Sequence, residues 1–153
     1  MLGTAGLDVN AATFHSACVR ILRKEITNLG YNNNFTIYDA EESQKLIKAC
    51  MADLGVGDRS FNPKAVINAI SAAKDKLMSP EQYIKEAGDD FKLSTYAKIY
   101  REYQKRLLAA NALDFDDIIM LTVELFEDFP EILEHYQNRY RYIMVDEYQD
   151  TNY

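Results

Sequence analysis

The chain has 153 residues, of which 48% are hydrophobic and 27% charged, and its formal net charge is −7 at pH 7. This length and composition are those of one globular domain with a buried core, and they exclude a disordered or fibrous chain. No apolar run approaches the roughly 20 residues that cross a bilayer, and the start of the chain lacks a secretory signal. We therefore expect a cytoplasmic protein with no membrane partner. The negative charge argues against nucleic-acid binding, although a basic face can lie on an acidic body.

The two cysteines, Cys18 and Cys50, lie far apart in helix-like patterns. They form no spacing that is typical of a metal or redox site. We expect both to be reduced thiols in the core of a cytosolic protein.

The beginning of the chain predicts a loop, a weak strand and an amphipathic helix. Two early glycines indicate the loop, and residues 9–12 the short strand. A helix is expected from Thr13 to about Leu29, because its apolar residues recur on one face and Gly30 follows as a stop.

Helices with recognisable first residues fill the middle of the chain. Asp39 is followed three residues later by Glu42, which is a capping-box pattern, and Asn62 and Ser79 each precede a proline at the first helical position. A long helix is expected over about 91–110. We interpret the tyrosines on its inner face as core residues and not as a stacking platform for bases.

The last third of the chain begins with Asp114, which we expect to cap a helix that is apolar nearly all round and therefore buried. Asp116 and Asp117 could form a metal cluster with Asp114, but a helix cap explains Asp114 more economically. A short helix is then expected over 130–139, and the apolar run 142–145 predicts a buried strand.

Strands are thus expected only near the two ends of a mainly α chain. A strand cannot satisfy its backbone hydrogen bonds alone, and two strands make a marginal sheet. We therefore expect the two strands to lie parallel in a larger sheet, with the helical body inserted between them. The chain would then be a piece of a larger enzyme.

Two adjacent carboxylates, Asp146 and Glu147, directly follow the terminal apolar run. In α/β proteins ligands bind at the carboxyl ends of the strands. In nucleoside-triphosphatases an aspartate at this place holds Mg²⁺, and a neighbouring acid or amide orients the attacking water. The alternative is an ordinary strand that ends in a solvated acidic turn.

The string Asp-Glu-Tyr-Gln-Asp-Thr-Asn at 146–152 resembles the second helicase motif of the superfamily 1 DNA helicases of the UvrD/Rep/PcrA type. Other strings resemble segments of the same family in the same order; they lie at 13–16 with 18–23, 70–74, 100–104 and 113–117. The resemblance therefore covers nearly the whole chain.

This resemblance implies a motor made of RecA-like domains, each with an inserted helical subdomain. Residues 1–16 would end one part of the motor domain, 17–139 would form the insert called subdomain 1B, and 140–153 would return to the motor domain. The implied fold is mainly α, with a helical-bundle insert flanked by two short, parallel strands of a RecA-like α/β motor domain.

The resemblance also implies a nucleotide site that binds ATP and Mg²⁺. Asp146 would coordinate the Mg²⁺ of bound ATP, and Glu147 would position or deprotonate the attacking water. Gln149 would lie on the following turn, where the nucleotide and DNA sites are coupled.

Two groups of side chains would contact DNA by the same resemblance. Thr13, Phe14 and His15 would lie near the single-stranded track, where polar groups bind phosphates and rings stack on bases. A core role for Phe14 is equally compatible with its helical pattern. A second group, made of Arg101, Lys105 and Arg106, would contact duplex phosphates. The alternative is that these cations only form a solvated face of their helix.

No Gly-x-x-x-x-Gly-Lys-Ser/Thr string occurs in the chain, so the loop that cradles ATP phosphates is missing. We expect the parent protein to be an ATP-dependent 3′→5′ DNA helicase and the fragment itself to lack ATPase activity. Its expected partners are junctions of single-stranded and duplex DNA, with repair or replication proteins as further candidates. The alternative is a non-catalytic α-helical module that binds protein or DNA.

Overall fold

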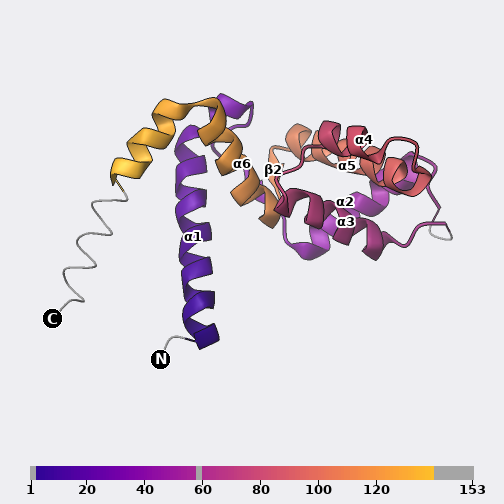
Figure 1. Cartoon of the computed structure of the whole chain (residues 1–153), viewed down its shortest axis with the longest axis horizontal. Coiled ribbons are helices and arrows are strands. Elements are labelled where there is room, and N and C mark those ends of the chain that lie inside the picture. The colour runs from indigo at the N-terminus through magenta and orange to yellow at the C-terminus, as the bar shows by residue number, and fades with distance from the viewer. Residues whose placement is uncertain (1–2, 58–59, 140–153) are drawn as a thin grey trace.

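The computed structural model describes residues 3–57 and 60–139, with side chains from residue 14 onward. Helices dominate it, and they form two lobes that meet in the middle of the molecule (Figure 1). The elements in chain order are α1 (Gly3–Glu25), η1 (Ile26–Leu29), β1 (Thr36–Ile37), α2 (Ala40–Asp53), α3 (Pro63–Asp75), α4 (Pro80–Ala87), α5 (Phe91–Ala109), β2 (Ala112–Leu113) and α6 (Phe115–Asp128). A further helical segment covers 130–139.

The predicted strand at residues 9–12 is wrong, because α1 runs unbroken from Gly3 to Glu25. Leu7, Ala11 and Ala12, in and just before this stretch, are good helix formers. Extending an existing helix adds a hydrogen bond for each residue fixed, without a new nucleus. The end of this helical region is as predicted, since η1 stops at Gly30 with φ 91°.

The predicted helix starts in the middle of the chain are confirmed. The Asp39 side chain accepts a hydrogen bond from the Glu42 backbone N–H at 2.8 Å, and the Glu42 carboxylate accepts one from the Asp39 N–H at 3.2 Å. Asn62 caps α3, and Ser79 forms a second capping box with Gln82. These contacts satisfy backbone donors that the first helical turn leaves unpaired.

A parallel pair of strands exists, but residues other than the predicted ones form it. Thr36 pairs with Ala112 and Ile37 with Leu113, so β1 and β2 lie side by side with α2–α5 as their crossover. The predicted terminal strand at 142–145 lies outside the described residues.

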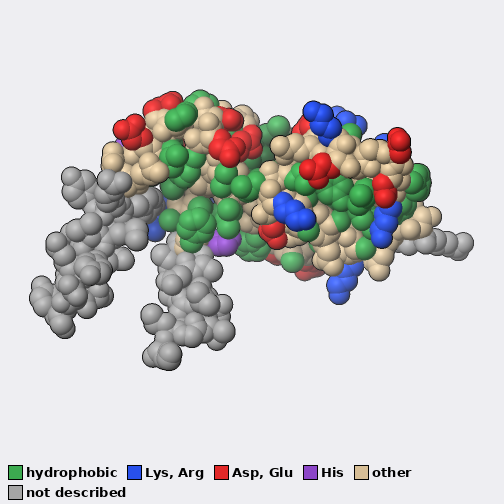
Figure 2. All heavy atoms as spheres, in the orientation of Figure 1, with side chains coloured by type: hydrophobic (Ala, Val, Ile, Leu, Met, Phe, Trp, Pro, Cys, Tyr) green, Lys and Arg blue, Asp and Glu red, His purple; other side chains and the backbone are tan. Residues whose placement is uncertain are grey.

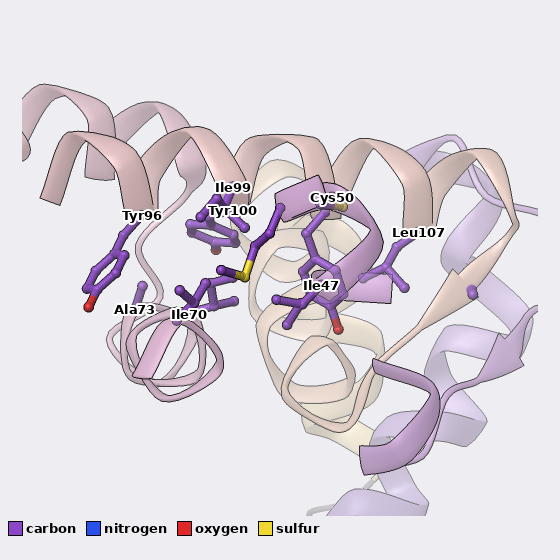
Figure 3. Close-up of a cluster of buried hydrophobic side chains, with 12 residues drawn as sticks. Ile47, Cys50, Ile70, Ala73, Tyr96, Ile99, Tyr100 and Leu107 are labelled. Carbon is purple, nitrogen blue, oxygen red and sulfur yellow. The ribbon is translucent and has the colours of Figure 1, made fainter. Parts of the chain in front are cut away.

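The hydrophobic residues of the two lobes form separate clusters. The first lobe, here called the four-helix lobe, contains α2–α5; its buried cluster includes the labelled residues in Figure 3, which are Ile47, Cys50, Ile70, Ala73, Tyr96, Ile99, Tyr100 and Leu107. The second, here called the α1–α6 lobe, contains α1, η1, α6 and 130–139. Its clusters are built around residues such as Leu22, Ile26 and Leu125. Each lobe thus has its own core.

Several predicted core residues lie where expected. Tyr96, Tyr100 and Tyr103 of α5 are buried, and both cysteines are buried and free. The helical pattern also places Leu108 on the inner face of this helix, but 45% of it is exposed.

Helix α6 is buried on one side only, which corrects the prediction of a fully buried helix. Its residues Ile118, Leu121 and Leu125 are buried. Ile119, Val123 and Phe126 instead line an open groove of about 440 Å³ between α6, α1 and the segment 130–139. The apolar residues on this second side are therefore not covered by the described part of the chain.

Candidate nucleic-acid interface

One face of α5 presents a row of cationic side chains. Arg101 and Lys105 are both exposed, as predicted, and so is Lys98 one turn earlier. Their spacing of three and four residues places them on one side of the helix. In the described part of the chain no ion pair joins any of the three to an acid. We call Lys98, Arg101 and Lys105 the cationic face of α5.

Arg106 does not belong to this face. Its guanidinium donates to Asp53 at 2.6 Å and to Glu102 at 3.2 Å. It ties α5 to α2 and so has less freedom to meet a phosphate than its neighbours. The sequence missed this because Asp53 is distant along the chain.

The predicted single-strand contacts lie on α1. Thr13 is helical, Phe14 is 55% exposed and His15 is half-buried. Phe14 lines the open groove beside α6, so the alternative of a fully buried core residue is wrong. The ring is accessible for contact with another molecule.

The residues of the predicted nucleotide site, Asp146, Glu147 and Gln149, lie outside the described residues. Their proposed roles with ATP and Mg²⁺ therefore stay predictions. Within the described ranges no group of His, Cys, Asp or Glu has an arrangement that could hold a metal ion. The alternative of a metal cluster at Asp114, Asp116 and Asp117 finds no support there.

A buried polar cluster joins three of the strings that carried the family resemblance. The Lys74 ammonium group contacts Asp114 at 2.7 Å and Asp117 at 2.9 Å, and its side chain is fully buried. The Tyr103 hydroxyl donates to Asp114 at 2.7 Å, and the Gln104 amide donates to Asp117 at 3.2 Å. We call these five residues the Lys74 cluster.

Asp114 caps α6, as predicted, and does so within this cluster. Its side chain accepts from the Asp117 backbone N–H at 2.9 Å, while the Asp117 carboxylate accepts from the Asp114 N–H at 3.2 Å. The positive end of the α6 dipole favours both carboxylates. The sequence predicted the cap but not the role of Lys74, because Lys74 reaches Asp114 across 40 residues.

Burial and charge oppose one another in the Lys74 cluster. Burial alone would lower the pKa of Lys74, but the carboxylates of Asp117 and Asp114 outweigh it and raise that pKa above its usual value. Burial would raise the pKa of Asp114, but Lys74 lowers it. For Asp117 burial prevails and the pKa is raised. Burial, assisted by Asp114, also raises the pKa of Tyr103.

The net negative charge is concentrated in one part of the sequence. Residues 36–113 carry 12 Lys or Arg and 11 Asp or Glu, whereas residues 114–153 carry 2 and 11. On the face shown in Figure 2, blue and red side chains are interspersed over the four-helix lobe, whereas red ones predominate over the other lobe. The overall charge therefore does not argue against anion binding by α5.

The sequence matches one known protein family, described as the UvrD/REP helicase N-terminal domain, over residues 2–153. Among curated proteins, it is 43% identical over 152 residues to the ATP-dependent DNA helicase PcrA of Bacillus subtilis (strain 168), which covers 99% of this chain and 20% of that protein. It is 47% identical over 146 residues to the ATP-dependent DNA helicase UvrD1 of Mycobacterium tuberculosis (strain ATCC 25618 / H37Rv), which covers 93% of this chain and 19% of that protein. The chain thus spans about a fifth of the length of these relatives.

No described helix is long and apolar enough to cross a membrane.

Proposed function

The chain belongs to the family of UvrD/REP helicase N-terminal domains, and from this membership we propose that it is part of an ATP-dependent 3′→5′ DNA helicase. The observation that carries the proposal is the match over nearly the whole chain to relatives named ATP-dependent DNA helicases. In this proposal the substrate is a junction of single-stranded and duplex DNA, the cofactors are ATP and Mg²⁺, and the location is the cytoplasm. Partners from DNA repair or replication fit the same function.

The proposed nucleotide site uses the acids near the end of the sequence. Asp146 would hold Mg²⁺, Glu147 would orient or deprotonate the attacking water, and Gln149 would lie on the following turn, where the nucleotide and DNA sites are coupled. Magnesium would supply charge neutralisation for the transferred phosphoryl group.

The proposed duplex contact is the cationic face of α5. Unpaired, exposed cations at helical spacing can neutralise phosphates without first breaking an internal ion pair. Of the cations predicted from sequence, Arg101 and Lys105 meet this condition and Arg106 does not. In our proposal residues 17–139, which include the four-helix lobe, are the inserted subdomain, and Thr13, Phe14 and His15 on α1 contact the single strand.

The duplex contact is tested by the binding of a labelled 3′-tailed duplex across a salt series. Arg101→Glu with Lys105→Glu should weaken binding at least about tenfold and reduce the salt slope by about 2. The control is Lys64→Glu with Lys76→Glu, two exposed positions outside α5 that change the net charge equally. Equal weakening by both pairs would show a general charge effect and contradict a site on α5.

The chain alone should not hydrolyse ATP, because it lacks the Gly-x-x-x-x-Gly-Lys-Ser/Thr loop that binds the phosphates. We expect no Mg²⁺-dependent phosphate release above buffer from the purified chain. A measurable rate that Glu147→Gln abolishes would contradict this expectation.

A non-catalytic binding module is the second candidate function, and the open apolar groove beside α1 and α6 favours it. A module that binds a protein through this groove would show no difference in DNA binding between the α5 variants and the unmodified chain. The salt series therefore separates the helicase part from a protein-binding module.

A further inference from the structure

The two lobes meet where β1 pairs with β2 and where α6 packs against α3. The chain passes between them through residues 30–39 and again through 110–114, where β1 and β2 pair. Adjacent residues of β2 enter different cores, since Ala112 packs in the four-helix lobe and Leu113 in the α1–α6 lobe. The buried hydrophobic clusters of the two lobes are separate, so polar contacts across this seam contribute to fixing the angle between the lobes.

The Lys74 cluster lies at this seam and draws on both sides of it. Lys74 comes from α3, Tyr103 and Gln104 from α5, and Asp114 and Asp117 from the start of α6. Helix α6 in turn packs on α1. Fully buried hydrogen bonds and ion pairs have narrow geometry, so the cluster fixes α6 relative to α3 and α5.

Lys74 itself is not needed to begin α6. Asp114 and Asp117 already satisfy each other's backbone N–H groups. A buried ion pair is often no more stabilising than apolar residues of similar volume, and in some proteins such a pair instead fixes one arrangement of the fold. What Lys74 adds is a fixed orientation of α6 relative to α3 and α5.

We propose that the Lys74 cluster is a positioning device that holds the cationic face of α5 at a fixed angle to Phe14 and His15 on α1. Helix α5 contributes Tyr103 and Gln104 to the cluster and carries Arg101 and Lys105 on its surface. A fixed angle lets the duplex and its single-stranded tail bind to the two lobes at the same time. This part of the inference rests on the proposed function.

The first test measures the angle between the lobes without DNA. Spin labels on cysteines introduced at Arg20 and Lys48, which are exposed residues of α1 and α2, report the distance between lobes. Labels at Lys48 and Lys98 report a distance within the four-helix lobe. The native cysteines are buried and free, and replacing them with alanine in all variants leaves only the introduced labels.

The test variant combines Lys74→Met with Asp117→Leu, which removes both ion pairs and the Asp117 half of the α6 cap. Asp114 keeps its bonds from the Tyr103 hydroxyl and from the backbone N–H of residue 117. We expect the distance distribution between lobes to broaden, while the distance within the four-helix lobe stays narrow. A folded variant whose distance between lobes matches that of the unmodified chain would overturn the proposal. If this variant does not fold, Tyr103→Phe with Gln104→Met removes the hydrogen bonds from α5 alone and is judged by the same comparison.

The second test compares a 3′-tailed duplex with a blunt duplex of the same sequence. A tailed duplex can contact α5 and α1 at the same time, and two linked contacts give a higher affinity than one. We therefore expect the unmodified chain to bind the tailed DNA about tenfold or more tightly than the blunt duplex. The Lys74→Met, Asp117→Leu variant should bind blunt duplex as before and lose this preference. A retained preference would overturn the positioning role. If the unmodified chain binds neither DNA, the proposed function fails, and the label distances alone decide whether the cluster positions the lobes.

Discussion

At the scale of single residues, the complete burial of the charged Lys74 side chain carries a large desolvation cost. A buried ammonium group is tolerated because two carboxylates lie within 2.9 Å of it. Removing one partner of such a set leaves uncompensated buried charge, so we expect Lys74→Met to lower the free energy of unfolding by about 3–5 kcal/mol. Lys76→Met, at an exposed position two residues away, should change it by less than about 0.5 kcal/mol. Urea denaturation measures both, and equal effects would contradict the role of the ion pairs.

The same neighbourhood makes the protein sensitive to alkali. Burial raises the pKa of Tyr31, Tyr100 and Tyr103, and nearby carboxylates raise that of Lys74. Above about pH 10 the unfolded chain therefore loses protons that the native chain keeps, and stability falls as pH rises. Each group contributes at most about 1.4 kcal/mol per pH unit. Tyr103→Phe should make this fall shallower between pH 10 and 11, as unfolding curves at several pH values would show; an unchanged slope would contradict this assignment.

At the scale of elements, two helices are followed by a residue in the left-handed backbone conformation, which destabilises the chain unless that residue is glycine. Gly55 follows α2 with φ 73° and has open space where a Cβ would lie. Leu77 follows α3 with φ 59° and is 43% exposed. Gly55→Ala should therefore destabilise the chain by about 1 kcal/mol, and Leu77→Gly should stabilise it by a similar amount. Thermal unfolding measures both, and a loss of stability in Leu77→Gly would show that its side chain packs more strongly than its exposure indicates.

Local chemistry made the helix starts predictable. Asp39, Ser79 and Asp114 all form the caps that their sequence patterns indicate. Residues 9–12 were mispredicted because a weak β preference counts for less than the continuation of α1. The β1–β2 pair was not predictable from pattern, since each strand is only two residues long and its partner lies across the whole four-helix lobe.

At the scale of the whole molecule, site features that depend on residues close in sequence were predictable. Features that depend on contacts between residues distant in sequence were not. The exposure of Arg101 and Lys105 follows from helical periodicity. The pairing of Arg106 with Asp53 and the burial of Lys74 depend on packing between helices that are distant in sequence. Net charge was misleading for a related reason, because it averages a nearly neutral lobe with a strongly acidic segment.

The most direct test of the helicase assignment places this chain in the matching fifth of Bacillus subtilis PcrA and measures ATP-dependent DNA unwinding. We expect the chimera to unwind a duplex with a 3′ tail, to leave one with a 5′ tail intact, and to lose activity with Glu147→Gln. A folded chimera that binds ATP and DNA but unwinds neither substrate would contradict the account.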